Sequence, residues 1–261
     1  MKFCSLSSGS SGNCQYLEYK NTKILIDAGL SGKKIENLLK DINVDIDSID
    51  AIFLTHEHID HVKGAGVLSR RHNMKIFTTE ETFKAMLPIT KEISGENIYF
   101  FQNNKAFNFK DLYIDPMDSF HDCVKGTCYS IIGNKKISIV TDTGMVSPEM
   151  MERIKGSSLY YLESNHDSDM LIQGSYPWST KQRIMSTRGH LSNDNAAKIL
   201  ERLLSKSEEI VMLSHLSRDN NDPKLAVRTV RDSLTNKNIR EGIDYIMEVS
   251  PRDSVSTIYD L

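Results

Sequence analysis

The chain has 261 residues, of which 39% are hydrophobic and 26% are charged, an ordinary composition for a globular protein with a large core. Its formal net charge of −3 argues against nucleic-acid binding through a global basic surface, although it leaves room for a local basic strip. No apolar run reaches the roughly 18 residues of a membrane span, no secretory signal is visible and the four cysteines form no Cys-x-x-Cys pair. We therefore expect a cytoplasmic protein with reduced thiols and no membrane contact.

The first third of the sequence alternates between strand and helix patterns. A strand pattern opens the chain, and residues 14–19 and 23–27 read as a hairpin. Ser31 can cap a helix that runs to Leu39. The next expected elements are a buried strand at 51–55, a helical pattern at 62–68, a strand at 75–78 and a helix at 80–87 that Pro88 ends.

The remainder of the sequence turns to strands and then back to alternation. Five strand patterns occupy residues 98–101, 106–109, 112–117, 127–132 and 136–140. After them come a helix at 147–155, a strand at 158–163, a helix capped by Ser192, a strand at 210–213 and a helix at 222–235. Two sheets packed face to face, with helices on both outer faces, satisfy this order, so we expect an α/β protein with an αββα four-layer sandwich.

One short motif carries most of the chemical information. His56-Glu57-His58-Ile59-Asp60-His61 directly follows the buried strand at 51–55. Three imidazoles and one carboxylate in six residues are the donor types that transition metals require. A histidine-rich surface loop is the alternative, but loops at the carboxyl ends of buried strands are favoured ligand sites.

Three further donors occupy equivalent places along the chain. His121, Asp142 and His215 each stand just beyond the end of an apolar strand, and each alone would be weak evidence. Together with the motif they can complete two metal sites if one carboxylate bridges both ions. Asp27, at the end of the strand at 23–27, is expected to accept a hydrogen bond from a metal-bound imidazole rather than to bind metal itself.

These residues resemble the five motifs of the metallo-β-lactamase fold, and the resemblance runs nearly the whole chain. Finer features resemble the YycJ/VicX (WalJ) branch of that fold, whose members are bacterial metal-dependent DNA exonucleases. These features are Ser8-Gly9-Ser10-Ser11-Gly12-Asn13, Glu163-Ser164-Asn165-His166-Asp167, Arg188-Gly189-His190-Leu191-Ser192-Asn193 and Leu213-Ser214-His215-Leu216-Ser217.

The resemblance implies a dinuclear site in one domain that spans residues 1–261. One ion is then held by His56, His58, His121 and Asp142, and the other by Asp60, His61, Asp142 and His215. Imidazole with carboxylate suits Mn or Zn, and Fe is possible. The 72 residues between Asp142 and His215 are too few for a β-CASP insertion, and the segment around His121 is closer to the tRNA-processing nuclease RNase Z than to lactamases.

The implied reaction is in-line attack of a metal-bridging hydroxide on a phosphodiester, in a DNA exonuclease that works from 5′ to 3′. Asp60 is expected to orient the hydroxide, and His190, just before a predicted helix, to protonate the leaving group. Two alternatives remain open: an RNase Z-like RNA-processing nuclease or small phosphodiesterase, and a non-catalytic regulatory partner of a cell-wall two-component system.

Substrate contacts are expected from three places. The glycine-rich turn with Ser10 and Asn13 offers N–H groups to a terminal phosphate, or is simply a tight connection between strands. His166 follows a strand at the same edge and either touches substrate or fixes a loop. The stretch 170–190 contains Tyr176, Trp178 and three basic residues, which can track a phosphate backbone or form a solvated helix face. The basic residues are Lys181, Arg183 and Arg188.

Overall fold

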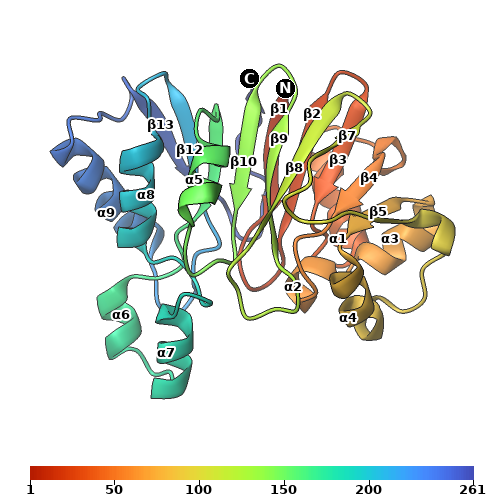
Figure 1. The fold of residues 1–261 in the computed structure, drawn as a ribbon, viewed down its shortest axis with the longest axis horizontal. Helices are drawn as coiled ribbons and strands as arrows, with labels where there is room; N and C mark the ends of the chain where they lie inside the picture. The colour runs from red at the N-terminus through yellow and green to blue at the C-terminus, as the bar shows by residue number, and fades with distance from the viewer.

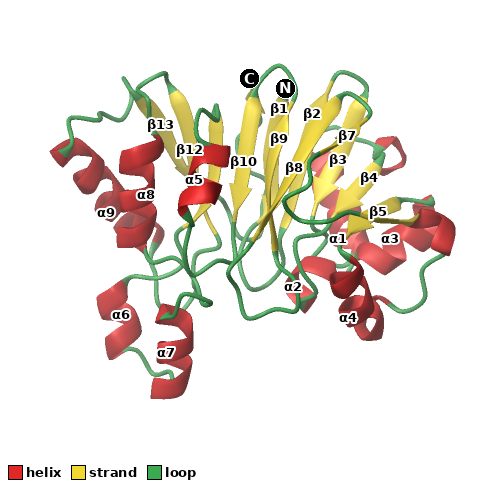
Figure 2. Cartoon of the chain, in the orientation of Figure 1, coloured by secondary structure: helices red, strands yellow, loops and turns green.

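Two seven-stranded sheets form the centre of the computed structural model, which describes residues 1–261, and helices cover their outer faces (Figure 1, Figure 2). The expected αββα order of layers is confirmed. The first sheet has the strand order β14-β1-β2-β3-β4-β5-β6 and the second the order β13-β12-β11-β10-β9-β8-β7. Both chain termini lie at one end of the sandwich, at the top of Figure 1. No helix has the length and apolarity to cross a membrane.

The strands match the expected positions in most of the chain. The first sheet contains β1 (Lys2–Ser7), β2 (Cys14–Tyr19), β3 (Thr22–Ile26), β4 (Ala51–Phe53), β5 (Lys75–Thr78), β6 (Ile98–Phe100) and β14 (Tyr259–Asp260). The second contains β7 (Phe107–Phe109), β8 (Leu112–Asp118), β9 (Thr127–Ile132), β10 (Lys136–Val140), β11 (Leu159–Glu163), β12 (Glu209–Ser214) and β13 (Tyr245–Val249). Strands β3 to β6 run parallel, and so do β10 to β13, so their carboxyl ends share one edge of each sheet.

Nine α-helices connect the strands. They are α1 (Gly32–Asp41), α2 (Ile59–Val62), α3 (Ala65–His72), α4 (Glu80–Thr90), α5 (Pro148–Ile154), α6 (Ser168–Gln173), α7 (Trp178–Met185), α8 (Asn193–Leu203) and α9 (Pro223–Asn236). Ser31 and Ser192 cap α1 and α8 as expected, each accepting an N–H from the first turn. Short 3₁₀ turns lie at Ile46–Ser48 and Gly95–Asn97.

Three buried clusters fill the layers. One lies between the sheets, and Ile24, Ile26 and Phe53 belong to it. Leu25 and Ile52, their neighbours in sequence, point to the opposite face and pack under α1, α3 and α4. The third cluster packs the second sheet against α5, α8 and α9. This alternation buries both faces of the central strands, which is why their sequences read as continuous apolar runs.

Two helix expectations are wrong in detail. Pro88 does not end α4, which continues to Thr90. A proline removes the hydrogen bond to the carbonyl four residues earlier and pushes against that carbonyl, which disturbs the helix locally. That residue, Lys84, is exposed, and the Thr90 hydroxyl donates to Met86 O at 3.2 Å within the last turn.

The helix expected at 62–68 is two helices, because α2 begins inside the histidine motif and stops at Val62. The chain is fixed between α2 and α3 where Gly64 donates its N–H to Ala28 O at 2.7 Å. A Cβ on Gly64 would lie 2.4 Å from Leu30 O, so this close approach interrupts the helical run.

Helices α6 and α7 and strands β13 and β14 had no separate prediction. Both helices are short, and Figure 1 shows them beyond the strand ends, at the same end of the sandwich as α2. Helices that leave the sandwich bury little of one face, so they carry no strong apolar period.

Candidate metal centre

The expected ligands and Asp27 gather at the edge of the sandwich where the parallel strands end. Asp27 follows β3, Asp142 follows β10 and His215 follows β12. All three have left-handed backbones, with φ of 60°, 51° and 54°. Such angles are uncommon outside glycine and cluster at functional sites, because the surrounding structure must hold them in place. These strand ends are therefore shaped to aim particular side chains.

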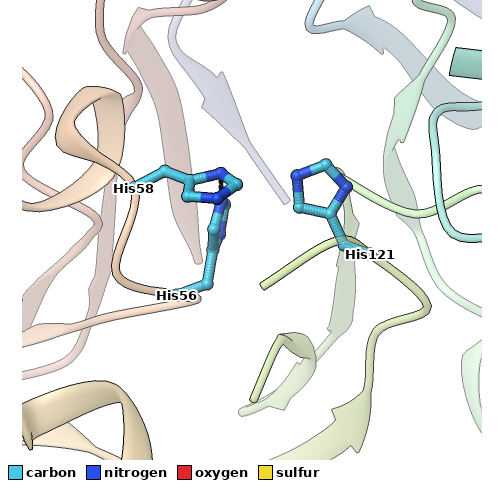
Figure 3. Close-up of side chains that lie close together, drawn as sticks. All are labelled: His56, His58 and His121. Carbon is cyan, nitrogen blue, oxygen red and sulfur yellow. Dashed lines mark hydrogen bonds between the residues drawn. The ribbon is translucent and has the colours of Figure 1, made fainter. Parts of the chain in front are cut away.

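Figure 3 shows that His56, His58 and His121 face one another from two separate segments of the chain. His56 Nε2 and His58 Nδ1 are 3.0 Å apart. The His121 ring centroid lies 5.2 Å from the centroids of both other rings. Ligand atoms of the three residues lie within 4.8 Å of one another, which is the spacing of donors around one ion.

Asp142 stands between that group and a second one. Its Oδ2 is 3.3 Å from His61 Nε2, and its Oδ1 is 3.5 Å from His215 Nε2 and 3.8 Å from His121 Nε2. Asp60 Oδ2 completes the second group, at 3.6 Å from His61 Nε2 and 3.8 Å from His215 Nε2. Asp142 thus contacts residues of both groups.

Hydrogen bonds behind the rings fix which nitrogen faces the centre. Asp27 Oδ2 accepts from His61 Nδ1 at 2.7 Å, and the carbonyl of Gly189 accepts from His121 Nδ1 at 3.1 Å. Glu163 Oε1 lies 3.1 Å from His215 Nδ1. In each ring Nδ1 is held by an outer acceptor, so the lone pair of Nε2 points inward, which is the arrangement of metal-binding imidazoles.

Asp27 is itself held by the residue before the motif. Its two oxygens accept the Thr55 N–H and the Thr55 hydroxyl, both at 2.8 Å. Burial raises the pKa of Asp27, although His61 counteracts part of this effect. Its carboxylate is fully engaged with His61 and Thr55, in agreement with a supporting rather than a ligating position.

Burial and neighbouring charges shift the other groups in opposite directions. Burial lowers the pKa of His56 well below its ordinary value, and neighbouring histidines lower it further. Burial also opposes protonation of His215, but Asp142, Asp60 and Glu163 outweigh it and raise the pKa to about 10. Burial alone would raise the pKa of Asp60, yet His61 and His215 bring it well below its ordinary value. The carboxylates of the site therefore favour a positive charge beside them, either a proton on His215 or a bound cation.

Two buried atoms at the centre have no hydrogen-bond partner: Asp142 Oδ2 and His215 Nε2. A buried polar atom without a partner is costly, and a bound cation would satisfy both atoms. Imidazole and carboxylate donors in overlapping groups fit divalent metal ions.

Glu163 is a site residue that the sequence reasoning did not single out for a role. It is fully buried at the end of β11, and Oε1 lies 2.7 Å from His190 Nδ1 as well as near His215. Oε2 accepts the N–H groups of Thr143 and Leu191 at 3.0 and 3.2 Å. The sequence did contain a signal for it, because Glu163 is an acidic residue at the end of an otherwise apolar strand. Asp27 follows its own apolar strand in a similar way.

His190 lies beside the predicted ligands. Its Nδ1 is 3.8 Å from Asp142 Oδ1. The side chain of His190 is 19% exposed to solvent, whereas that of Glu163 is fully buried. Burial lowers the pKa of His190, but Glu163 outweighs this effect and the net shift is upward.

The three basic residues of the stretch 170–190 have different environments. Lys181 is buried and donates to the carbonyls of Ile172 and Gly174, both at 2.7 Å, so it ties α7 to the end of α6. Arg183 is exposed and pairs with Asp122 at 3.0 Å. Arg188 donates to the carbonyl of His121 at 3.0 and 3.2 Å and is otherwise exposed at the rim of the site.

The other residues expected to contact substrate, Ser10, Asn13 and His166, also differ in how exposed they are. Asn13 is buried against the centre, with Nδ2 3.1 Å from His61 Nε2, while Ser10 is exposed at the tip of the same turn. His166 is buried, its ring makes no hydrogen bond within the protein, and its carbonyl accepts from Asn193 N at 2.9 Å. Burial lowers the pKa of His166 to about 4, so the ring is neutral at neutral pH.

Comparison with known proteins identifies the group to which this architecture belongs. Residues 8–215 match the Metallo-beta-lactamase superfamily. The chain is 39% identical over 254 residues to exodeoxyribonuclease WalJ of Streptococcus pneumoniae serotype 2, covering 96% of this chain and 94% of that protein. It is 37% identical over 254 residues to exodeoxyribonuclease YycJ of Bacillus anthracis, covering 97% and 96%.

A solved structure agrees at the level of the fold. The metallo-beta-lactamase fold protein YhfI from Bacillus subtilis superposes with a TM-score of 0.71 at 14% identity, over 98% of this chain and 100% of that one. The chain therefore belongs to the metallo-beta-lactamase superfamily of metal-dependent hydrolases, and within it to the same family as the exodeoxyribonucleases WalJ and YycJ.

Proposed function

We propose that this chain is a dinuclear metal-dependent phosphodiesterase that acts as a DNA exonuclease in the 5′ to 3′ direction. The observation that carries the proposal is the position of Asp142 between two groups of metal-binding donors. The near full-length similarity to two proteins named exodeoxyribonucleases supports DNA as the substrate. We also infer that residues 1–261 act as one catalytic domain, since both sheets contribute donors.

We assign the ligands from the donor groups and from the hydrogen bonds behind the rings, which leave Glu163 and His190 as partners of each other rather than as ligands. His56, His58 and His121 would hold the first ion, and Asp60, His61 and His215 the second, with Asp142 shared between them. Asp27 would keep His61 in the tautomer that binds metal, as Glu163 would for His215. The donors suit Mn or Zn, and Fe is a further candidate.

When bound, two divalent cations lower the pKa of water and neutralise the charge of the phosphodiester for in-line attack. Asp60 would orient the attacking water; in support, its side chain is partly open to solvent beside His61 and His215. His190 would donate a proton from its ring to the departing oxygen. Burial opposes protonation of this ring, but Glu163 outweighs it and raises the pKa of His190 above its ordinary value, which favours the protonated form that a general acid requires.

Arg183 and Arg188 at the rim would contact phosphates of the bound strand, whereas Lys181 would act through the position of α7. Helix α7 also exposes Trp178, with 58% of its surface accessible, to which an unstacked base can bind.

The test is digestion of end-labelled single- and double-stranded DNA and RNA by the metal-loaded protein, with and without a 5′ phosphate. We expect stepwise release of nucleotides from the 5′ end of DNA. Asp60→Ala should abolish cleavage, whereas Asp232→Ala, which removes an exposed carboxylate on α9, should leave it unchanged.

Other outcomes decide against the proposal in different ways. Preferential cleavage of RNA would favour an RNA-processing nuclease at the same site. Release from the 3′ end would contradict the direction alone. No turnover on any substrate with any of the three metals would favour a regulatory role through partners.

A further inference from the structure

A pocket of about 400 Å³ lies beside the metal centre, at the junction of four segments that are distant in sequence. Its lining includes Ser10 and Ser11 from the β1–β2 turn, Tyr176 from the α6–α7 connection, Ser217 and Arg218 after β12, and Arg252 after β13. Its volume is in the range of small-ligand sites.

The pocket offers several hydrogen-bond donors that the protein does not use. The backbone N–H groups of Ser10 and Ser11 donate to no acceptor in the protein. Arg218 is exposed and forms no ion pair. Arg252 donates one N–H to the carbonyl of Leu216 at 2.7 Å, and its guanidinium pairs with no carboxylate. Two guanidinium groups and two adjacent amides are donors typical of phosphate sites.

Glycine at position 9 makes room for this arrangement. A Cβ there would lie 2.8 Å from Arg252 Nη1, and the φ angle of Gly9 is +118°. Only glycine adopts this backbone readily, so the turn lets Arg252 approach the amides of the following serines.

Two carboxylates also line the pocket, but both have partners. Asp219 accepts the hydroxyl of Tyr176 at 2.7 Å, and Asp253 pairs with Lys34 at 3.1 Å. Asp219 keeps its negative charge, because the tyrosine hydroxyl is neutral, so the lining sets two arginines against one carboxylate that has no cationic partner. This positive balance favours an anionic ligand.

The turn that carries Ser10 and Ser11 also contacts residues of the metal centre. Ser8 Oγ accepts the N–H of His215 at 2.8 Å, and Asn13 N donates to the carbonyl of Asp60 at 2.8 Å. Ser217 is two residues from His215, so their Cα atoms are at most about 7.6 Å apart.

We infer that this pocket binds a phosphate group of the substrate strand close to the phosphodiester that is cut. The inference rests on the proposed function, because it takes the strand to be the ligand of the neighbouring centre. The phosphate is either the 5′-terminal group or an internal one, and both would be held by the same donors.

The experiment measures binding rather than cleavage. Metal-loaded protein is titrated into fluorescent single-stranded DNA whose 5′-end linkages are phosphorothioates, which resist hydrolysis, at several salt concentrations. Arg218→Ala should raise the Kd about tenfold through the loss of a charge-assisted hydrogen bond. It should also reduce the slope of log Kd against log salt by about 0.7, the share of one phosphate contact. Arg218→Lys should recover part of the affinity.

The control is Arg228→Ala, which removes an exposed, unpaired arginine on α9. It should change neither quantity. A 5′-phosphorylated and a 5′-hydroxyl strand are compared in parallel. A loss confined to the phosphorylated strand assigns the pocket to the terminus, and an equal loss assigns it to an internal phosphate. Unchanged Kd and slope on both strands would overturn the inference, and an absence of cleavage by the parent protein would instead count against the proposed function.

Discussion

His190 differs from the other histidines of the centre because Glu163 holds one side of its ring while the other side stays partly exposed. His190→Ala should leave metal content unchanged and lower the rate of the chemical step about 100-fold, because the departing oxygen loses its proton donor. Single-turnover digestion and elemental analysis measure the two quantities separately. Loss of an ion in the variant would make His190 a ligand instead, and an unchanged rate would remove it from the mechanism.

His166 predicts a pH dependence of stability. Burial lowers its pKa to about 4 in the folded chain, whereas an unfolded histidine titrates near about 6.5. Between these values the unfolded chain binds the proton and the folded chain does not, so the free energy of unfolding falls as the pH falls. The slope from this residue reaches about 1.4 kcal/mol per pH unit.

His166→Phe keeps a ring of similar size and removes the titration. Denaturant unfolding of the metal-free protein at pH 7, 6, 5 and 4.5 should give a shallower loss of stability for the variant than for the parent protein. Parallel curves through this window would show that His166 is not the group that titrates.

Individual residues show where reasoning from the sequence reaches its limit. The histidine motif, His121, Asp142 and His215 were predicted to converge, because ligands at the carboxyl ends of parallel strands share one edge. Lys181 was placed among substrate contacts because a sequence shows a charge but not its partner, and here two backbone carbonyls hold the ammonium group. Glu163 was not assigned a role for the same reason, since its partners His190 and His215 are distant in sequence.

At the scale of elements, the connection between β3 and α1 determines where α2 lies. Gly29 donates its N–H to the carbonyl of Asn13 at 2.8 Å, and a Cβ on Gly29 would lie 1.6 Å from the carbonyl of Asp60. Gly29→Ala should therefore displace α2, lower the free energy of unfolding by about 1–3 kcal/mol and weaken metal binding. Denaturant titration and metal titration monitor the two effects.

Gly95→Ala provides the matched control, because a Cβ there meets no atom within 4 Å. Gly95→Ala should change the free energy of unfolding by no more than about 0.5 kcal/mol and should leave the metal affinity unchanged. If Gly29→Ala behaved like this control, the close packing of the connection against α2 would not determine the position of Asp60.

Strands were predicted more reliably than helices, and the reason lies in burial. The central strands are covered on both faces, so their sequences are apolar runs that end sharply. Helix boundaries depended on contacts with distant residues, as at Gly64, where the carbonyls of Ala28 and Leu30 interrupt the pattern. Helices α6 and α7 lie outside the sandwich and leave too weak an apolar period to be recognised.

At the scale of the whole molecule, the centre lies where the two sheets meet. The first sheet and its connections supply Asp27 and the histidine motif, and the second supplies His121, Asp142 and His215. Metal ions held by both sets would link the two halves of the sandwich. Because an unfolded chain separates these donors, ions that bind the folded chain stabilise it by mass action, by about 2.7 kcal/mol at a hundredfold excess over Kd.

Removing metal should therefore lower Tm, and the effect should depend on pH. Metal binding requires neutral imidazoles, and Asp142, Asp60 and Glu163 overcome burial to raise the pKa of His215 to about 10 in the metal-free site. An ion must displace this proton, so the difference in Tm between manganese-loaded and chelator-treated protein should be larger at pH 8 than at pH 6. Thermal unfolding of both forms at the two pH values measures this difference in Tm. The Asp142→Ala variant loses the shared carboxylate, so adding metal should change its Tm little at either pH. Equal Tm values with and without metal in the parent protein would mean that the ions do not link the two halves of the sandwich.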